Sequence, residues 1–128
     1  MLSYNISKFF EHPYREDIIV KINFIASLII NVIIWLALYF KLHSFSYTTA
    51  AGQIYLHYNL YFGIDNIGFW YEALVIPLLG LFIIIFNNGL AYYFYIQDKV
   101  LSYTLVFFQT ILQIILFFSA IFVILLNI

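Results

Sequence analysis

The sequence contains no cysteine, and charged residues make up only 9% of its 128 positions. The absence of cysteine excludes disulfides, thiolate metal sites and cysteine nucleophiles. Soluble domains have roughly 25% charged residues, so the shortage of charge excludes an ordinary water-soluble fold. The net charge of −1 comes without a basic cluster, and we therefore expect no nucleic acid as a partner.

Hydrophobic residues take the place of the missing charge and make up 66% of the chain. Three uncharged apolar runs cover most of its length, at residues 22–40, 73–96 and 100–126. Each run is close to or above the ~20 residues that an α-helix needs to cross a hydrocarbon layer of about 30 Å. The sequence therefore predicts an all-α fold, an integral membrane three-helix bundle that forms one membrane domain over residues 1–128.

The flanking residues set the expected element boundaries. Apolar side chains at helical spacing predict a short N-terminal interfacial helix at residues 1–12, which Pro13 ends. The spanning helices are expected at 17–41, 70–97 and 100–126, with a partly extended outer loop at 42–69. Asp17 suits a helix start and stands four residues before Lys21, with which it can pair across one turn. Pro77 is expected to bend the outer third of the second spanning helix.

Only residues 97–99 separate the second and third spanning helices, so these two helices must form a tight antiparallel hairpin. Tyrosines gather near this turn as an interfacial aromatic belt would. Basic residues are retained in the cytoplasm, and four of the five lie toward one side, namely Lys8, Arg15, Lys21 and Lys99, with Lys41 toward the other. We expect a multi-pass protein of the inner (cytoplasmic) cell membrane with the N-terminus in the cytoplasm and the C-terminus outside.

Five amide side chains lie inside the predicted spans, where they need hydrogen-bond partners. They are Asn31, Asn87, Asn88, Gln109 and Gln113. Asn87 and Gln109 are equally far from Asp98 in the predicted turn, which favours a hydrogen bond between them across the hairpin. These amides act either as structural links between helices, as the lining of a path for an ion or polar solute, or as an oligomer contact. The absence of deep charged residues favours the first reading.

The outer loop carries the other candidate site. Alternating apolar residues, Ile54, Leu56 and Tyr58, favour a short extended segment on the membrane surface or the helix ends. The candidate binding or capping residues are His57, Asn59, Asp65 and Glu72. His57 is placed to bond Asp65, and Asp65 or Asn66 to cap the next helix. With His43, three of these residues are possible ligands for a divalent metal, but their spacing matches no metal signature, so we expect no metal and no other cofactor.

The segment HYNLYFGIDNIG, residues 57–68, resembles a segment of small uncharacterised bacterial polytopic membrane proteins. It is also distantly similar to a domain of unknown function in membrane proteins of the toxin-immunity and signalling type. His57, Asn59 and Asp65 match the histidine, asparagine and aspartate of that pattern, whereas Leu56 replaces its proline and Gly63 stands one place later. The resemblance implies a bacterial membrane origin and no defined activity.

The sequence contains no nucleophile motif, no phosphate-binding loop and no pair of carboxylates at a common membrane depth, so we expect no enzyme. The remaining reading is an accessory, assembly or interaction subunit of the sensor or immunity type, in contact with membrane lipids and with a protein partner or further copies of itself. The alternative is a component of an oligomeric channel or transporter lined by the Asn/Gln face.

Overall fold

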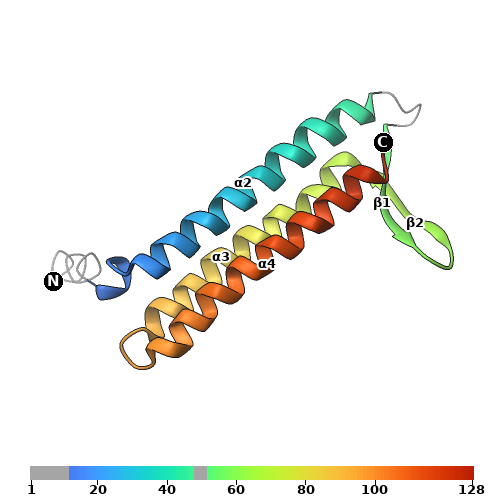
Figure 1. Ribbon diagram of the computed structural model, residues 1–128. Coiled ribbons are helices and arrows are strands. Elements are labelled where there is room, and N and C mark those ends of the chain that lie inside the picture. Colours follow the sequence, from blue (N-terminus) through green and yellow to red (C-terminus); the bar gives the residue numbers. More distant parts are fainter. Residues whose placement is uncertain (1–11, 48–51) are drawn as a thin grey trace, which may run out of the picture.

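The computed structural model describes residues 12–47 and 52–128. The long helices are α2 (Ile18–Ser46), α3 (Val75–Phe94) and α4 (Lys99–Leu125), and the short 3₁₀ segments η1 (Pro13–Arg15) and η2 (Trp70–Leu74) precede α2 and α3. Strands β1 (Gln53–Asn59) and β2 (Gly63–Phe69) form an antiparallel hairpin. The hairpin lies at the end of the bundle that also holds the C-terminus (Figure 1). The predicted interfacial helix at 1–12 falls outside the described residues, apart from position 12.

Within the described residues, three helical stretches are long and apolar enough to cross a membrane, Ile18–Ser44, Trp70–Phe94 and Lys99–Leu125. Large apolar side chains on these stretches face outward, for example Phe82 at 62% exposed and Phe122 at 65%, whereas Gln109 is fully buried. Lipid favours this arrangement because apolar side chains can face acyl chains while polar groups pair inside. The predicted all-α three-helix membrane bundle is confirmed, with a β-hairpin between α2 and α3.

The start of α2 follows the predicted pattern, but its end does not. Asp17 caps the helix, because its Oδ1 accepts hydrogen bonds from the backbone N–H groups of Ile19 (2.9 Å) and Val20 (3.4 Å). The helix then continues to Ser46, five residues beyond the expected end at Lys41. No proline or glycine interrupts the sequence between them, so nothing local ends the helix there.

Pro77 lies close to a change of helix geometry in the outer third of the second spanning stretch. The expected long helix is divided into the 3₁₀ segment η2 and the α-helix α3, and Pro77 is the third residue of α3. Proline is tolerated in the first helical turn because the missing N–H would have no partner within the helix there. The interruption expected near Pro77 is therefore a change from 3₁₀ to α geometry, which occurs two residues before it.

The α3–α4 hairpin is confirmed, with its turn at residues 95–98. The backbone N–H of Asp98 donates to the carbonyl of Phe94 (2.7 Å), and the Asp98 side chain caps α4 through the N–H of Leu101 (3.0 Å). Ser102 Oγ donates to the carbonyl of Ala91 (2.8 Å), and both residues are fully buried. Two small residues thus let the helices approach closely beside the turn.

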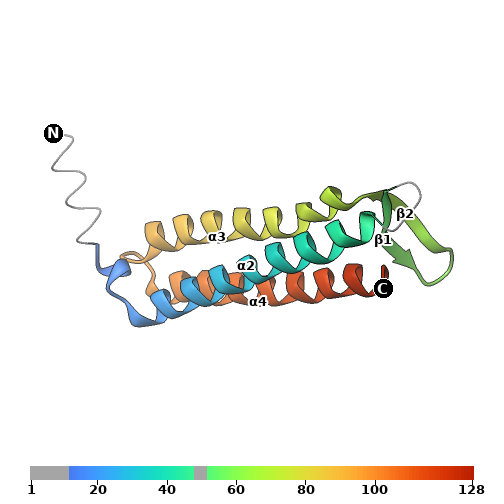
Figure 2. The same cartoon turned by 90° about the horizontal axis from the view of Figure 1, so that it is seen from above.

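The interior has three layers along the bundle axis. An apolar cluster near the hairpin includes Leu38, Leu42 and Ile54, and a second near the α3–α4 turn includes Val106 and Tyr95. Amide and hydroxyl side chains occupy much of the interior between them. Seen from above, α2 extends along α3 and α4 and contacts both (Figure 2), so all three helices contribute to the polar layer.

Candidate functional site

Two of the predicted amides join all three helices in the polar layer. Asn31 of α2 donates from Nδ2 to the carbonyl of Pro77 (2.9 Å) and to Gln113 Oε1 (3.3 Å). Gln113 of α4 donates from Nε2 to the carbonyl of Gly80 in α3 (2.8 Å). A methyl group on Gly80 would lie 2.8 Å from Gln113 Oε1, so the glycine allows the amides to reach the α3 backbone.

The predicted hydrogen bond between Asn87 and Gln109 is wrong by one residue. Asn88 is the donor to Gln109 Oε1 (2.5 Å), and its Nδ2 also donates to the carbonyl of Ile84 (2.8 Å). Two other hydrogen bonds cross the hairpin, from Ser102 to Ala91 and from Gln113 to Gly80. In each, the two residues are equally far from the point between residues 96 and 97, so the centre of the hairpin lies there and not at Asp98. With the centre at that point, Ile84 lies at the same depth as Gln109, and Asn88, one helical turn further along α3, bonds to Gln109. Asn87 is also buried.

Gln109 is only partly paired. Its Nε2 is buried and has no hydrogen-bond partner within the described part of the chain. Asn88, in contrast, accepts a further bond at Oδ1 from the Tyr14 hydroxyl (2.7 Å). Hydrogen-bonded amides therefore occur in two groups, one in the middle of the bundle and one nearer its α3–α4 end. Among the described residues, one buried donor of the second group is unused.

A hydroxyl pair between α2 and α4 was not predicted. Ser27 Oγ and Thr110 Oγ1 share a hydrogen bond at 3.1 Å, and Thr110 Oγ1 also donates to Asn23 Oδ1 (3.0 Å). A signal was present in the sequence, because Asn23, Ser27 and Asn31 recur every four residues and so share one face of α2. That stripe identifies the face of α2 that packs inward.

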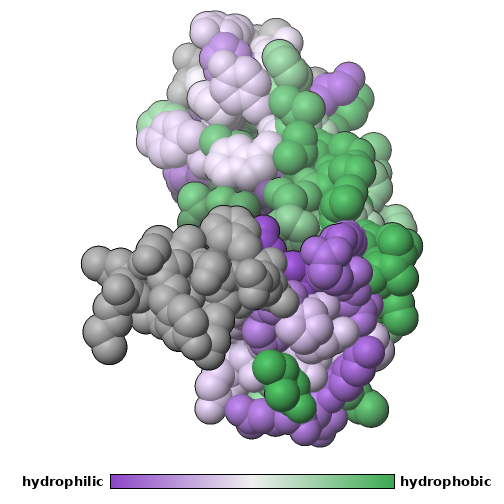
Figure 3. Space-filling view, turned by 90° about the vertical axis from the view of Figure 1, so that its left-hand side faces the viewer, coloured by the Kyte–Doolittle hydropathy of each residue, from purple (hydrophilic) through white to green (hydrophobic). Residues whose placement is uncertain are grey.

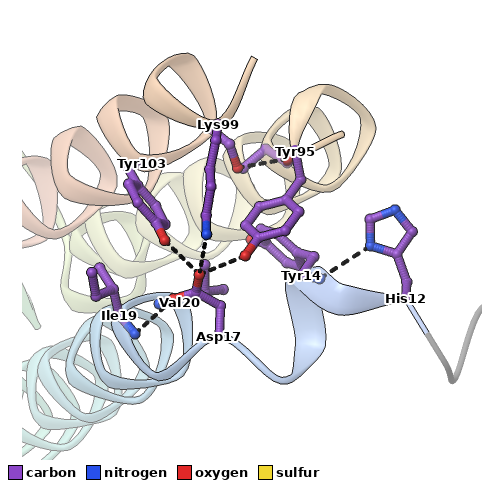
Figure 4. Close-up of polar contacts among 10 residues, drawn as sticks. His12, Tyr14, Asp17, Ile19, Val20, Tyr95, Lys99 and Tyr103 are labelled. Carbon is purple, nitrogen blue, oxygen red and sulfur yellow. Dashed lines mark hydrogen bonds and ion pairs between the residues drawn. The ribbon is translucent and has the colours of Figure 1, made fainter. Parts of the chain in front are cut away.

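At the α3–α4 end, one carboxylate joins three elements (Figure 4). Asp17 Oδ2 accepts hydrogen bonds from the hydroxyls of Tyr95 (2.6 Å) and Tyr103 (2.5 Å), and Lys99 Nζ lies 3.7 Å away. The Asp17 side chain is only 8% exposed. The expected pair of Asp17 with Lys21 is wrong, because Lys21 binds Glu16 instead (3.4 Å). We call Asp17, Tyr95, Lys99 and Tyr103 the Asp17 clamp.

The protonation of the Asp17 clamp follows from its contacts. Burial raises the pKa of Asp17, but the hydrogen bonds from Tyr103, Tyr95 and the backbone outweigh it and lower the pKa to about 2. Burial, and then the hydrogen bond to Asp17, raise the pKa of Tyr95. Burial and the charge of Asp17 raise the pKa of nearby Tyr14 to about 12. At neutral pH the carboxylate is therefore charged and these tyrosines are neutral, which suits a fixed fastening better than proton transfer.

The β1–β2 hairpin has a three-residue turn. Asn59 Oδ1 accepts from the backbone N–H of Tyr61 (2.9 Å), and Gly63 takes a φ of 75° that other residues rarely adopt. Asn59 is therefore a turn residue. Side chains of the turn are almost fully exposed, Leu60 at 89%, Tyr61 at 91% and Phe62 at 84%. We call these three residues the apolar turn.

The base of the hairpin is fixed to the helices. Asn127 accepts from the backbone N–H of Tyr55 (2.8 Å) and donates to its carbonyl (2.7 Å), as a neighbouring strand would. Glu72 Oε1 accepts from the backbone N–H of Phe69 (2.9 Å). Glu72 thus has the capping role that the sequence assigned to Asp65 or Asn66. The sequence did not point to Asn127.

The remaining candidates of the predicted loop lie in the hairpin and near the end of α2. His57 is opposite Asn66 in the strand register, and Asp65 belongs to β2, although its side chain lies outside what the structure describes. His43 stacks on Tyr39 with ring centres 5.4 Å apart. Among residues 12–47 and 52–128, no three His, Asp or Glu side chains converge as a metal site requires.

Comparison with protein-family models, curated proteins and solved structures finds no match to this chain.

Proposed function

We propose that this chain is a non-catalytic accessory or assembly subunit in the membrane, and that its hairpin binds a partner membrane protein. The apolar turn carries this proposal. Leu60, Tyr61 and Phe62 are 89%, 91% and 84% exposed on a short, tightly turned hairpin. Aromatic and large apolar side chains dominate the binding energy of protein interfaces.

The anchoring of the hairpin supports a docking role. Asn127 and Glu72 bind its backbone at 2.7–2.9 Å, and Ile54 at its base is only 2% exposed. A surface held in one conformation loses less entropy when it binds. In Figure 1 the hairpin runs across the direction of the helices and extends beyond their ends and flank. A neighbouring membrane protein would therefore contact the apolar turn before it contacted the bundle.

The polar interior supports the absence of catalysis. Asn31, Asn88 and Gln113 bind one another's helices through hydrogen bonds of 2.5–3.3 Å. The Asp17 clamp holds a charged carboxylate with a pKa far below neutral. Because these amides and this carboxylate already have hydrogen-bond partners on other helices, their role is to hold the helices together rather than to react with a substrate.

We further propose that the chain lies in an inner cell membrane with the N-terminus in the cytoplasm and the hairpin outside. Arg15, Lys21 and Lys99 lie at the α3–α4 end, and Lys41 lies toward the hairpin end of α2. Positive residues favour the cytoplasmic side. The resemblance of residues 57–68 to toxin-immunity-type membrane proteins agrees with a bacterial membrane.

The test is co-purification from membranes of the source organism under mild solubilisation. We expect one membrane protein to co-purify in fixed stoichiometry and to crosslink to a photoreactive residue at Tyr61. Changing the apolar turn to Ser, Asn and Ser should abolish both results while the bundle stays folded. Tyr47→Ser, a change of another exposed tyrosine (78%) at the same end, should preserve them. Equal co-purification with both variants, or crosslinks to lipid alone, would contradict the proposal.

The alternative, an oligomeric channel or transporter component lined by the Asn/Gln face, has one specific observation in its favour. Gln109 Nε2 is buried without a partner in the described residues, and such a donor is available to a passing polar solute. Liposome flux of the pure protein decides between the two. Flux that Gln109→Leu removes without loss of folding would favour the channel.

A further inference from the structure

A groove of about 490 Å³ lies between the start of α2 and the end of α3, near the α3–α4 turn. This volume is in the range of roughly 300–1,000 Å³ that is typical of ligand sites. Val20, Phe24 and Gly89 form its apolar part, and Arg15 and Lys21 line it as well. Tyr14 and Asn88, already joined by a 2.7 Å hydrogen bond, form the inner wall.

The groove runs from the membrane boundary into the hydrocarbon region. Arg15 precedes the first spanning stretch, which begins at Ile18. Phe24 is six residues inside that boundary and Gly89 is five residues from the end of α3 at Phe94, so both lie roughly 8–9 Å deep at about 1.5 Å per residue. Arg15 is thus at headgroup depth, and Lys21, about one turn inside the boundary, reaches the same depth through its long side chain. The apolar lining is at the depth of acyl chains.

Gly89 creates part of the open space. A methyl group built on Gly89 would meet no atom within 4 Å. A methyl group built on Gly80 of the same helix would, in contrast, overlap the buried amides of Asn31 and Gln113. The fold therefore requires the glycine at 80 but not at 89, where a larger side chain would fill the groove.

The groove has two basic side chains in its lining. Arg15 and Lys21 belong to its lining, whereas Glu16, which pairs with Lys21 at 3.4 Å, does not. That pair is largely exposed, at 47% and 79% of the two side chains, so it is weak in water. Asp17 faces the clamp, where Lys99 lies 3.7 Å away. Figure 3 shows the bundle from its α3–α4 end. Hydrophilic residues gather around this end, and hydrophobic residues lie along the flank of the bundle.

We propose that this groove is a binding site for one anionic phospholipid, with the phosphate at Arg15 and Lys21 and an acyl chain along Phe24 and Gly89. Basic pockets between spanning helices bind anionic headgroups by charge complementarity. A lipid is already the solvent of this surface, so an acyl chain reaches the groove without leaving the membrane. The site is at the opposite end from the hairpin and does not depend on the proposed docking role.

The test uses native mass spectrometry of the delipidated full chain in detergent, titrated with phosphatidylglycerol or phosphatidylcholine. We expect one phosphatidylglycerol per chain, bound about tenfold more tightly than phosphatidylcholine, since each basic residue near an anionic surface contributes a severalfold gain. Arg15→Gln with Lys21→Gln should remove this preference, and Lys41→Gln at the other end should keep it. Gly89→Leu should abolish the bound lipid of either kind.

Folding is checked separately, by thermal unfolding in detergent without added lipid. Gly89→Leu should unfold no earlier than the natural chain, because leucine favours helix more than glycine does. Equal binding of the two lipids, retention of lipid by Gly89→Leu, or a lipid-free dimer that Gly89→Leu dissociates would each overturn the proposal. Free phosphate competing at millimolar concentration would also overturn it, because the site would then need no acyl chain.

Discussion

Replacing Asp17 by asparagine tests the main fastening at the α3–α4 end. The change keeps the shape of the side chain and its ability to cap α2, but removes the charge at which Tyr95, Tyr103 and Lys99 converge. The pKa of Asp17 falls from an ordinary 3.8 to about 2 on folding. At about 1.4 kcal/mol per pKa unit, the ionised carboxylate stabilises the fold by about 2 kcal/mol at neutral pH.

The pH dependence of this stabilisation has a defined sign. The folded-state pKa is the lower one, so the contribution is fully present above the unfolded pKa of 3.8 and is lost as pH falls through about 2. About half of the contribution should be gone near pH 3. The free energy of unfolding, measured by detergent titration in mixed micelles, should therefore differ by about 2 kcal/mol between Asp17→Asn and the natural chain at pH 7, and the difference should shrink below pH 4.

Asp98→Asn is the matched control. Asp98 also caps a helix, with its Oδ1 3.0 Å from the N–H of Leu101, but its side chain is exposed. Asparagine caps about as well as aspartate, so this change should be nearly neutral at pH 7. An Asp17→Asn chain as stable as the natural one at pH 7, or a difference that stays constant down to pH 2.5, would refute the account of the clamp.

Three further changes probe other parts of the fold. Gly80→Ala should lower the free energy of unfolding by about 1–3 kcal/mol through overlap with buried amides, whereas Gly89→Ala should not lower it; equal effects would contradict the close packing at Gly80. Asn127→Leu should spare the helices but speed hydrogen exchange at the Tyr55 amide by about tenfold, since hydrogen bonds are worth about 1 kcal/mol each; unchanged exchange would mean that Asn127 does not hold the hairpin. Tyr14→Phe should cost about 1 kcal/mol at pH 7. The natural chain should lose stability as pH rises from 10 toward 12, because the pKa of Tyr14 is raised to about 12 on folding, and Tyr14→Phe should show less of this loss.

The membrane bundle was predictable because lipid imposes few solutions on a chain. A run of about 20 apolar residues must be helical, since backbone groups have no other partners in hydrocarbon. The start of α2 at Asp17 and the tight α3–α4 turn followed from capping and spacing. Of the predicted amides, Asn31, Asn88, Gln109 and Gln113 all take part in cross-helix hydrogen bonds.

The partners of these side chains were harder to predict, because they depend on helix rotation and on contacts distant in sequence. A shift of the hairpin centre by one or two residues exchanges Asn87 for Asn88 as the partner of Gln109. The Asp17 clamp joins residues up to 86 positions apart. In the sequence alone, its tyrosines cannot be distinguished from those of an ordinary interfacial aromatic belt. The hairpin was only partly predictable, since alternation identified an extended segment but not its pairing with residues 63–69.

The bond between Asn127 and Tyr55 also sets an order of events during synthesis. The two residues are 72 positions apart, so at about 5–20 residues per second the ribosome adds Asn127 roughly 4–14 s after Tyr55. Throughout that interval, the backbone N–H and carbonyl of Tyr55 at the edge of β1 lack the Asn127 side chain as a partner. This edge is then open to pairing with another nascent strand. A reporter fused just before position 127 would leave that edge permanently open, and a reporter fused after it would allow the edge to close.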